Sequence, residues 1–131
     1  MNREIKFRGK RVDNGEWVYG YYWTNEVDNH FIRVTKTETG LFVIKDYEVD
    51  GKTVGQYTGL KDKNGKEIYE GDIIEAENRL WQIGFRDGCF VGVDFKNVAW
   101  DELVNISYGE TKVIGNVFED SELLEVANGQ Y

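Results

Sequence analysis

Short runs in which apolar and polar residues alternate, separated by glycine-containing turns, cover most of this chain. Alternation with a period of two places every second side chain on the same face, which predicts half-buried β-strands rather than helices. Several runs are separated by Asn-Gly or Asp-Gly, and these dipeptides favour tight reversals between antiparallel strands. The pattern therefore predicts an all-β protein made of many short strands.

Residues 56–75 contain the clearest turn signals. Asn64-Gly65 predicts a hairpin closed by a type I′ turn, in which both central residues have positive φ. A second reversal is expected at Glu70-Gly71-Asp72, before two isoleucines open the next strand. With 15 glycines and no proline in the chain, glycine must supply the positive φ angles at such turns.

The rest of the chain after this hairpin reads as a series of β elements. They are predicted at residues 71–77, 80–86, 89–95, 98–106 and 112–118. The fourth fits a helical turn as well as a strand, and a short helix with carboxylates near its N-terminus is expected at 119–125. Short strands with tight turns in this density predict an SH3-type small barrel at residues 56–131. Residues 1–55 are expected to form an N-terminal β-hairpin region that packs on the barrel.

The first half contains an unusual run of aromatic residues. On a strand over 16–23, one face would carry Trp17, Tyr19, Tyr21 and Trp23. Aromatic residues have strong strand preference and fill small cores, but such a face could also stack on bases or sugars, or form a subunit interface. We keep these interpretations open. The stripe and the basic residues Arg8 and Arg11 are the candidate interaction residues.

Composition and charge narrow the choice of partner. The hydrophobic share of 40% and the aromatic share of 15% argue against disorder. The net charge of −8 disfavours general binding to a phosphate backbone. The charge is uneven, with +4 over residues 1–12 and −6 over residues 101–131. Such poles could pair between copies of the chain or across one molecule, or could simply be solvated faces.

Residues that could carry out catalysis are scarce. The chain has one histidine, His30, and one cysteine, Cys89, too few for a zinc site and a poor basis for a nucleophile–histidine pair. Asp46, Glu48 and Asp50 would project from one strand face, where a solvated face is expected rather than a metal site. Glu70, Asp72, Glu75 and Glu77 form the nearest cluster of paired carboxylates, but they lie at a hairpin and strand start. We expect no catalytic centre, no metal and no cofactor.

Targeting signals are also lacking. The first residues are charged throughout, unlike a secretory signal, and no apolar run approaches the roughly 20 residues of a membrane helix. We therefore expect a cytoplasmic protein without a membrane partner.

Several segments resemble the YopX family of phage and prophage proteins. The resemblance is carried by residues 54–60 (VGQYTGL), 62–73 (DKNGKEIYEGDI) and 114–117 (IGNV), followed by Glu119 and Leu123-Leu124, and by the opening segments 6–10 and 15–20. It implies a β-rich protein with an SH3-like part, of phage or prophage origin, in a bacterial cytoplasm. It implies no activity.

Two hypotheses of function follow. The first is a non-catalytic accessory protein that binds a host or phage protein, or that self-associates, with aromatic residues as interface anchors. The alternative is a small-barrel nucleic-acid-binding module that uses the N-terminal basic segment and the aromatic residues.

Overall fold

The computed structural model describes residues 4–94, 99–106 and 110–123, and over these residues the chain is mainly β, as predicted. Its internal contacts divide the chain into two compact units, Met1–Tyr57 and Thr58–Tyr131, called here the N-terminal and C-terminal units. Strand β4 (Leu41–Lys61) contributes to both units. The described strands form two antiparallel sheets, of which the first continues through β4 into the C-terminal unit and the second lies within that unit. Each unit has its own buried residues.

The N-terminal unit is a sheet that closes on itself. Its other strands are β1 (Phe7–Arg11), β2 (Trp17–Thr24) and β3 (His30–Glu38). Each strand pairs with the next, and β4 pairs back with β1, so the four strands form a closed ring. Ile32 (0% exposed) and Val49 (2% exposed) lie on the inner face. The sheet therefore has a buried inner face and an outer face.

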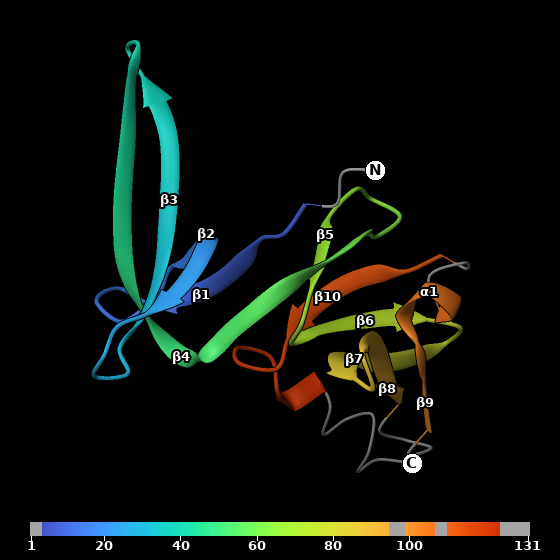
Figure 1. Ribbon diagram of the computed structural model, residues 1–131. Helices are drawn as coiled ribbons and strands as arrows, with labels where there is room; N and C mark the ends of the chain where they lie inside the picture. The colour runs from blue at the N-terminus through green and yellow to red at the C-terminus, as the bar shows by residue number, and fades with distance from the viewer. Residues whose placement is uncertain (1–3, 95–98, 107–109, 124–131) are drawn as a thin grey trace. The chain divides into compact units, whose positions relative to one another are not determined.

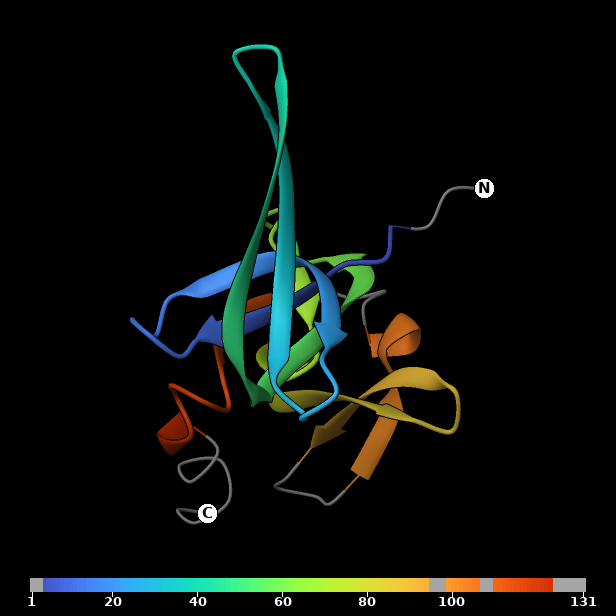
Figure 2. The same ribbon diagram turned by 60° about the vertical axis from the view of Figure 1, so that its left-hand side comes forward.

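Strands β3 and β4 continue past the rest of this sheet as a long hairpin (Figures 1 and 2). Strand β2 pairs with β3 only as far as Arg33, whereas β3 and β4 stay paired from His30↔Val49 to Glu38↔Leu41. Residues 34–45 thus form a two-stranded segment, called here the ribbon. Among the described residues, no third strand pairs with the ribbon.

Strand β4 is longer and less regular than expected. Asp50-Gly51, one of the Asp-Gly dipeptides expected to mark a reversal, instead lies inside the strand at an irregularity in the β1–β4 register. Thr53 stabilises this irregularity, because its hydroxyl donates to the Asp50 carbonyl (2.6 Å) and accepts from the Lys10 N–H (2.9 Å). The side chain therefore replaces ladder bonds that the backbone cannot make there, and the strand continues.

The C-terminal unit contains a small, barrel-like antiparallel sheet and one short helix. Its strands are β5 (Glu67–Tyr69), which pairs with the end of β4, and β6 (Asp72–Ala76), β7 (Arg79–Arg86), β8 (Cys89–Asp94), β9 (Ala99–Glu102) and β10 (Lys112–Asn116). Strands β6 to β9 form a meander, and β10 returns after the short helix α1 (Leu103–Ile106) to pair with β6. The core contains Ile68, Ile74, Ala76, Trp81, Ile83, Leu103, Ile106 and Val113.

The two ambiguous predictions near the C-terminus are resolved in part. The segment predicted at 98–106 is both strand and helix, because β9 ends where α1 begins at Leu103. Of the helix predicted at 119–125, residues 122 and 123 are helical, and the remainder lies outside the described residues. Residues 95 and 98, which are terminal residues of two predicted strands, also lie outside the described residues.

Three hairpins are closed by two-residue turns in which both residues have positive φ. They join β3 to β4, β6 to β7 and β7 to β8, at Thr39-Gly40 (47° and 79°), Glu77-Asn78 (56° and 60°) and Asp87-Gly88 (52° and 84°). This is the geometry of type I′ turns, whose twist matches that of the flanking strands.

The turn at Asn64-Gly65, predicted to be of type I′, is of a different type. Only Gly65 has positive φ (83°), and its N–H donates to the carbonyl of Asp62 (3.0 Å). The Asp62 side chain also accepts from the N–H groups of Asn64 and Lys66, both at 2.9 Å. These bonds favour a type I turn followed by a glycine in the left-handed region, a common three-residue hairpin connection.

The Asp62 carboxylate also reaches the last strand of the barrel. Its second oxygen accepts from the N–H of Val113 on β10 at 2.9 Å, and the residue is 7% exposed. Burial alone would raise the pKa of Asp62, but the bonds from Val113, Lys66 and Asn64 together lower it below the ordinary value. The charged carboxylate is therefore the form that the fold stabilises.

We expect Asp62→Asn to lower the free energy of unfolding by about 1–3 kcal/mol at pH 7, because an amide nitrogen cannot accept and a buried N–H loses its partner. Urea unfolding monitored by tryptophan fluorescence measures this. Since the folded pKa is the lower one, the contribution is complete above about pH 4 and disappears as the pH falls through the folded value. Asp87→Asn at an exposed turn is the control. Equal stability of parent and Asp62→Asn at pH 7 would contradict the assignment.

Substitution of two glycines, Gly65 and Gly71, compares the cost of backbone strain alone with the cost of strain plus steric crowding. Both Gly65 (φ 83°) and Gly71 (φ 90°) require the left-handed region, but a Cβ would meet open space at Gly65 and the Phe118 ring at 2.8 Å at Gly71. Gly65→Ala should cost about 1 kcal/mol from strain alone, and Gly71→Ala should cost more. Thermal unfolding of both variants checks this order, and the reverse order would contradict it.

Candidate functional site

The aromatic stripe lies on the outer face of the N-terminal sheet. Trp17 and Tyr19 are opposite Lys10 and Arg8 of β1, and Tyr21 and Trp23 are opposite Arg33 and Phe31 of β3. Their neighbours on the inner face, such as Tyr22, pair with the buried Ile32. Tyr19 is 44% exposed and Tyr21 is 61% exposed. The stripe is therefore not part of the buried core of the closed sheet.

The half of the stripe nearest β3 belongs to a compact cluster from three strands. Trp23 stacks on Phe31, with ring centroids 4.4 Å apart and planes at 18°, and the Arg33 guanidinium lies 5.6 Å from the Trp23 ring centroid. Asp46 of β4 accepts from Trp23 Nε1 (3.1 Å) and from Arg33 Nε (2.9 Å) and Nη2 (3.0 Å). We call Tyr21, Trp23, Phe31, Arg33 and Asp46 the aromatic patch.

The charges of the aromatic patch compensate each other. The hydrogen bonds from Arg33 lower the pKa of Asp46, with a smaller contribution from Trp23, and the Asp46 carboxylate raises the pKa of Arg33. Both groups are therefore ionised at neutral pH and paired in two parallel bonds, a geometry specific to arginine and carboxylate. The patch is thus a nearly neutral aromatic surface in which the ion pair fixes the orientation of the Trp23 indole.

The candidate arginines are located elsewhere. Arg8 is 5% exposed, with its guanidinium 4.5 Å from the Trp17 ring centroid, so it contacts the other half of the stripe as a buried residue. Arg11 is on the inner-face side of β1, opposite Val49, where its guanidinium bonds to Asp13 (2.6 Å) and lies 4.5 Å from the Tyr47 ring. The structure thus places Arg8 beside the stripe and separates Arg11 from it.

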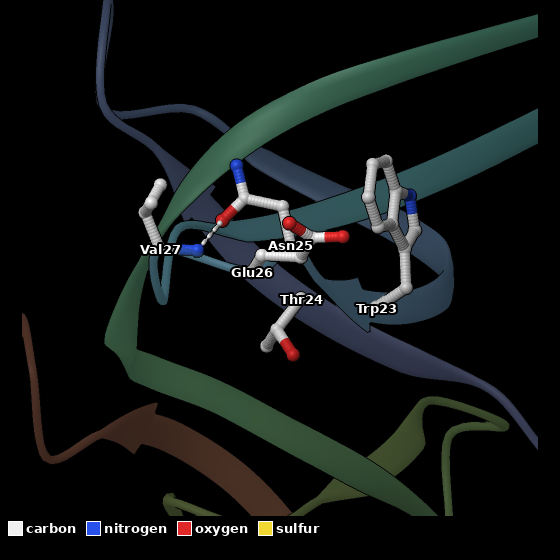
Figure 3. A pocket seen from close by; sticks show the side chains of 5 residues that line it. All are labelled: Trp23, Thr24, Asn25, Glu26 and Val27. Carbon is white, nitrogen blue, oxygen red and sulfur yellow. Dashed lines mark hydrogen bonds between the residues drawn. The ribbon is translucent and has the colours of Figure 1, made fainter.

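An open hollow of about 630 Å³ adjoins the aromatic patch (Figure 3). It is lined by Trp23 and Thr24 at the end of β2 and by Asn25, Glu26 and Val27 of the loop that follows. Asn25 holds this loop, because its side-chain oxygen accepts from the N–H groups of Val27 (3.1 Å) and Asn29 (2.9 Å). Val27 is 77% exposed at its rim. The hollow is therefore an open depression next to Trp23.

Reactive groups do not converge at this surface. In the described part of the chain, no three histidine, cysteine or acidic side chains lie close enough to hold a metal ion. Asp46 and Glu48 instead accept hydrogen bonds from Arg33 and Asn29, and Asp50 accepts from the Lys52 N–H. His30 Nδ1 is 2.6 Å from the Tyr22 hydroxyl, and the two rings are parallel.

Helices in the described residues are also too short and too polar to cross a bilayer.

Three residues of the aromatic patch were absent from the sequence-based candidates. Phe31 and Arg33 belong to the alternating run of β3, and Asp46 was interpreted as part of a solvated acidic face. The sequence signal that could have identified them is the alternation of aromatic and charged residues in β3, the next strand in the chain, which could pair with the stripe. Which residues meet depends on the register of β2, β3 and β4, which sequence alone does not fix.

Comparison with known proteins gives a family and two similar structures. Residues 6–125 match the YopX protein family. The crystal structure of protein EF1440 from Enterococcus faecalis aligns with a TM-score of 0.62 and 27% identity, over 95% of this chain and 100% of that chain. The crystal structure of protein yopX from Bacillus subtilis aligns with a TM-score of 0.52 and 20% identity, over 90% of this chain and 96% of that one. No curated protein matches the chain.

The pairing of Arg33 with Asp46 can be tested by titration. We expect Arg33→Ala to raise the pKa of Asp46 towards the ordinary value, because the largest cause of the lowered pKa is removed. The carboxyl ¹³C shift of Asp46, followed by NMR from pH 2 to 7, measures it. The matched control is Glu38, whose pKa is lowered by Lys36 and should not change. An unchanged Asp46 titration would contradict the pairing.

Proposed function

The chain belongs to the YopX family, and from this premise we propose that it is a non-catalytic accessory protein, encoded by a phage or prophage, that acts by binding another protein in the bacterial cytoplasm. The observation that supports this proposal is the aromatic patch on the outer face of the N-terminal sheet. Tryptophan, tyrosine and arginine are the residues that dominate binding energy at protein interfaces.

The aromatic patch has the properties of a preorganised binding surface. The stacking on Phe31 and the bond to Asp46 restrict the Trp23 side chain before any partner arrives. Little side-chain entropy is then lost on binding, which favours affinity. Tyr21, at 61% exposure, offers a large apolar ring with a hydroxyl at its edge. The hollow beside Trp23 has room for a side chain of the partner.

Nucleic-acid binding is the alternative, and the charges support it less. The cation nearest the aromatic patch, Arg33, is already paired with Asp46, and Arg8 is buried. The net charge of −8 opposes association with phosphate backbones. The remaining support is Lys10, whose ammonium lies 5.8 Å from the Trp17 ring centroid. Titration with single- and double-stranded DNA and RNA at low salt distinguishes the two functions.

The proposal predicts which side chains a partner needs. Tagged protein is used to capture partners from lysate of a bacterial host, and the affinity of each partner is then measured with purified components. We expect Tyr21→Ala and Trp23→Ala each to weaken binding at least about 10-fold, the loss typical of an interface anchor.

The matched control is Phe85→Ala, which removes an aromatic ring of similar exposure (54%) from the C-terminal unit and should leave binding unchanged. Circular dichroism establishes that the variants are folded. Partners captured equally by the parent and by both patch variants would contradict the role of the aromatic patch. Salt-sensitive binding to DNA or RNA without a protein partner would favour the alternative.

A further inference from the structure

The ribbon has an open strand edge with a defined set of backbone groups. Glu38 and Leu41 flank a two-residue turn and therefore exchange backbone hydrogen bonds with each other. Along the ribbon every second pair does the same, so the next such pairs are Lys36 with Val43 and Val34 with Lys45. The N–H and C=O groups of Leu41, Val43 and Lys45 consequently point to β3. Those of Phe42 and Ile44 point away from β3, to the side where no described strand pairs with this part of β4.

Over residues 41–44 this edge lacks the features that normally prevent association, and the one lysine of the paired stretch, Lys45, lies at its end. Its residues Leu41-Phe42-Val43-Ile44 contain no charge and no proline, and Leu41, Phe42 and Ile44 are 67%, 68% and 53% exposed. Edge strands usually carry lysine, proline or a bulge that blocks pairing with another chain. A two-stranded ribbon by itself is marginally stable in water, so added strands would stabilise it.

We propose that two copies of the chain pair through this edge, with β4 of one copy antiparallel to β4 of the other and the two-fold axis at Val43. The four strands of the two ribbons then form one continuous sheet. The proposal goes beyond the binding of another protein by the aromatic patch, because it concerns a different surface.

The sequence of the edge is self-complementary in this register. Phe42 of each copy lies opposite Ile44 of the other copy, and the outward-pointing backbone groups of the two residues face each other. All four of these N–H groups therefore gain acceptors. The side chains of these residues then form an apolar cluster on one face, since directly opposite residues of antiparallel strands lie on the same face. Val43 meets Val43, and Lys45 meets Leu41.

Charge favours a second copy meeting at the ribbon rather than elsewhere. Residues 58–131 contain 15 acidic and seven basic residues, whereas residues 1–57 contain nine of each. Within the ribbon the charged residues are Lys36, Glu38 and Lys45. No acidic residue opposes another acidic residue in the β4 pairing, whereas two copies that met through residues 58–131 would bring like charges together.

The size of the contact sets the expected affinity. Pairing extends over five residues of each strand, less than the area of a standard stable interface. We therefore expect a dimer with a dissociation constant in the micromolar range. Sedimentation velocity of the unmodified chain, from about 1 to 500 μM, should show a monomer that converts to a dimer.

The register is tested by cysteine cross-linking in the full-length chain with Cys89→Ser, which removes the native thiol. Val43→Cys should form a dimer through a disulfide in oxidised glutathione, because opposite residues of this pair type have Cα atoms about 4.5 Å apart. Leu41→Cys should not, because its copy would be about 14 Å away along the strand. Thr37→Cys, on the β3 edge, reports whether the ribbons pair through the other side.

A charge on the edge provides the second test. Ile44→Lys should weaken dimerisation at least about 10-fold, since two lysines would enter the apolar cluster, and Val27→Lys, an exposed substitution outside the ribbon, should not. A monomer at all concentrations, cross-linking of Thr37→Cys instead of Val43→Cys, or equal dimerisation of Ile44→Lys and the parent would overturn the proposal. Tyr21→Ala should dimerise normally, which separates this result from a failure of partner binding.

Discussion

The Asp62 carboxylate connects parts of the C-terminal unit that are 51 residues apart in the chain. One oxygen binds the turn between β4 and β5, and the other binds Val113 on β10. The Lys63 N–H adds a bond to the Thr111 carbonyl at 2.9 Å. The Val113 N–H would otherwise be buried without an acceptor, and the three backbone donors together offset the cost of burying the Asp62 charge. The carboxylate therefore ties the start of β10 to the turn between β4 and β5, in addition to the pairing of β10 with β6.

In the N-terminal unit the sheet is closed by the pairing of strands rather than by a side chain. This closure determines which face of the sheet can serve as a binding surface. When β4 pairs back with β1, one face of each strand turns inward, around Ile32 and Val49. The aromatic stripe is on the other face because Trp17 to Trp23 alternate with the inward residues. A run of aromatic residues in a small protein would normally fill the core. Here the most deeply buried residues of the inner face are the aliphatic Ile32 and Val49, and Tyr19 and Tyr21 remain exposed on the outer face.

Sequence reasoning identified the strands well because their signals are local. Alternation and the glycine-containing turns located most elements, and the mainly β fold followed from their spacing. The turn type at Asn64-Gly65 was wrong because the Asp62 side chain, and not the dipeptide, determines the backbone there. Of the aromatic patch, Tyr21 and Trp23 could be identified, whereas Phe31, Arg33 and Asp46 could not. Their contacts arise from the pairing of three strands, and a shift of one residue in either register would have brought different side chains together.

The three two-residue turns have a consequence for how such a chain can vary. Thr39-Gly40, Glu77-Asn78 and Asp87-Gly88 each join strands with no spare residue. One inserted residue would exchange the two faces of every position beyond it until a bulge absorbed the change. Substitutions within these turns are limited only by the left-handed backbone, which asparagine, aspartate and glycine tolerate. A change of length in these hairpins therefore needs a compensating bulge, whereas a change of side chain needs only a residue that tolerates the left-handed region.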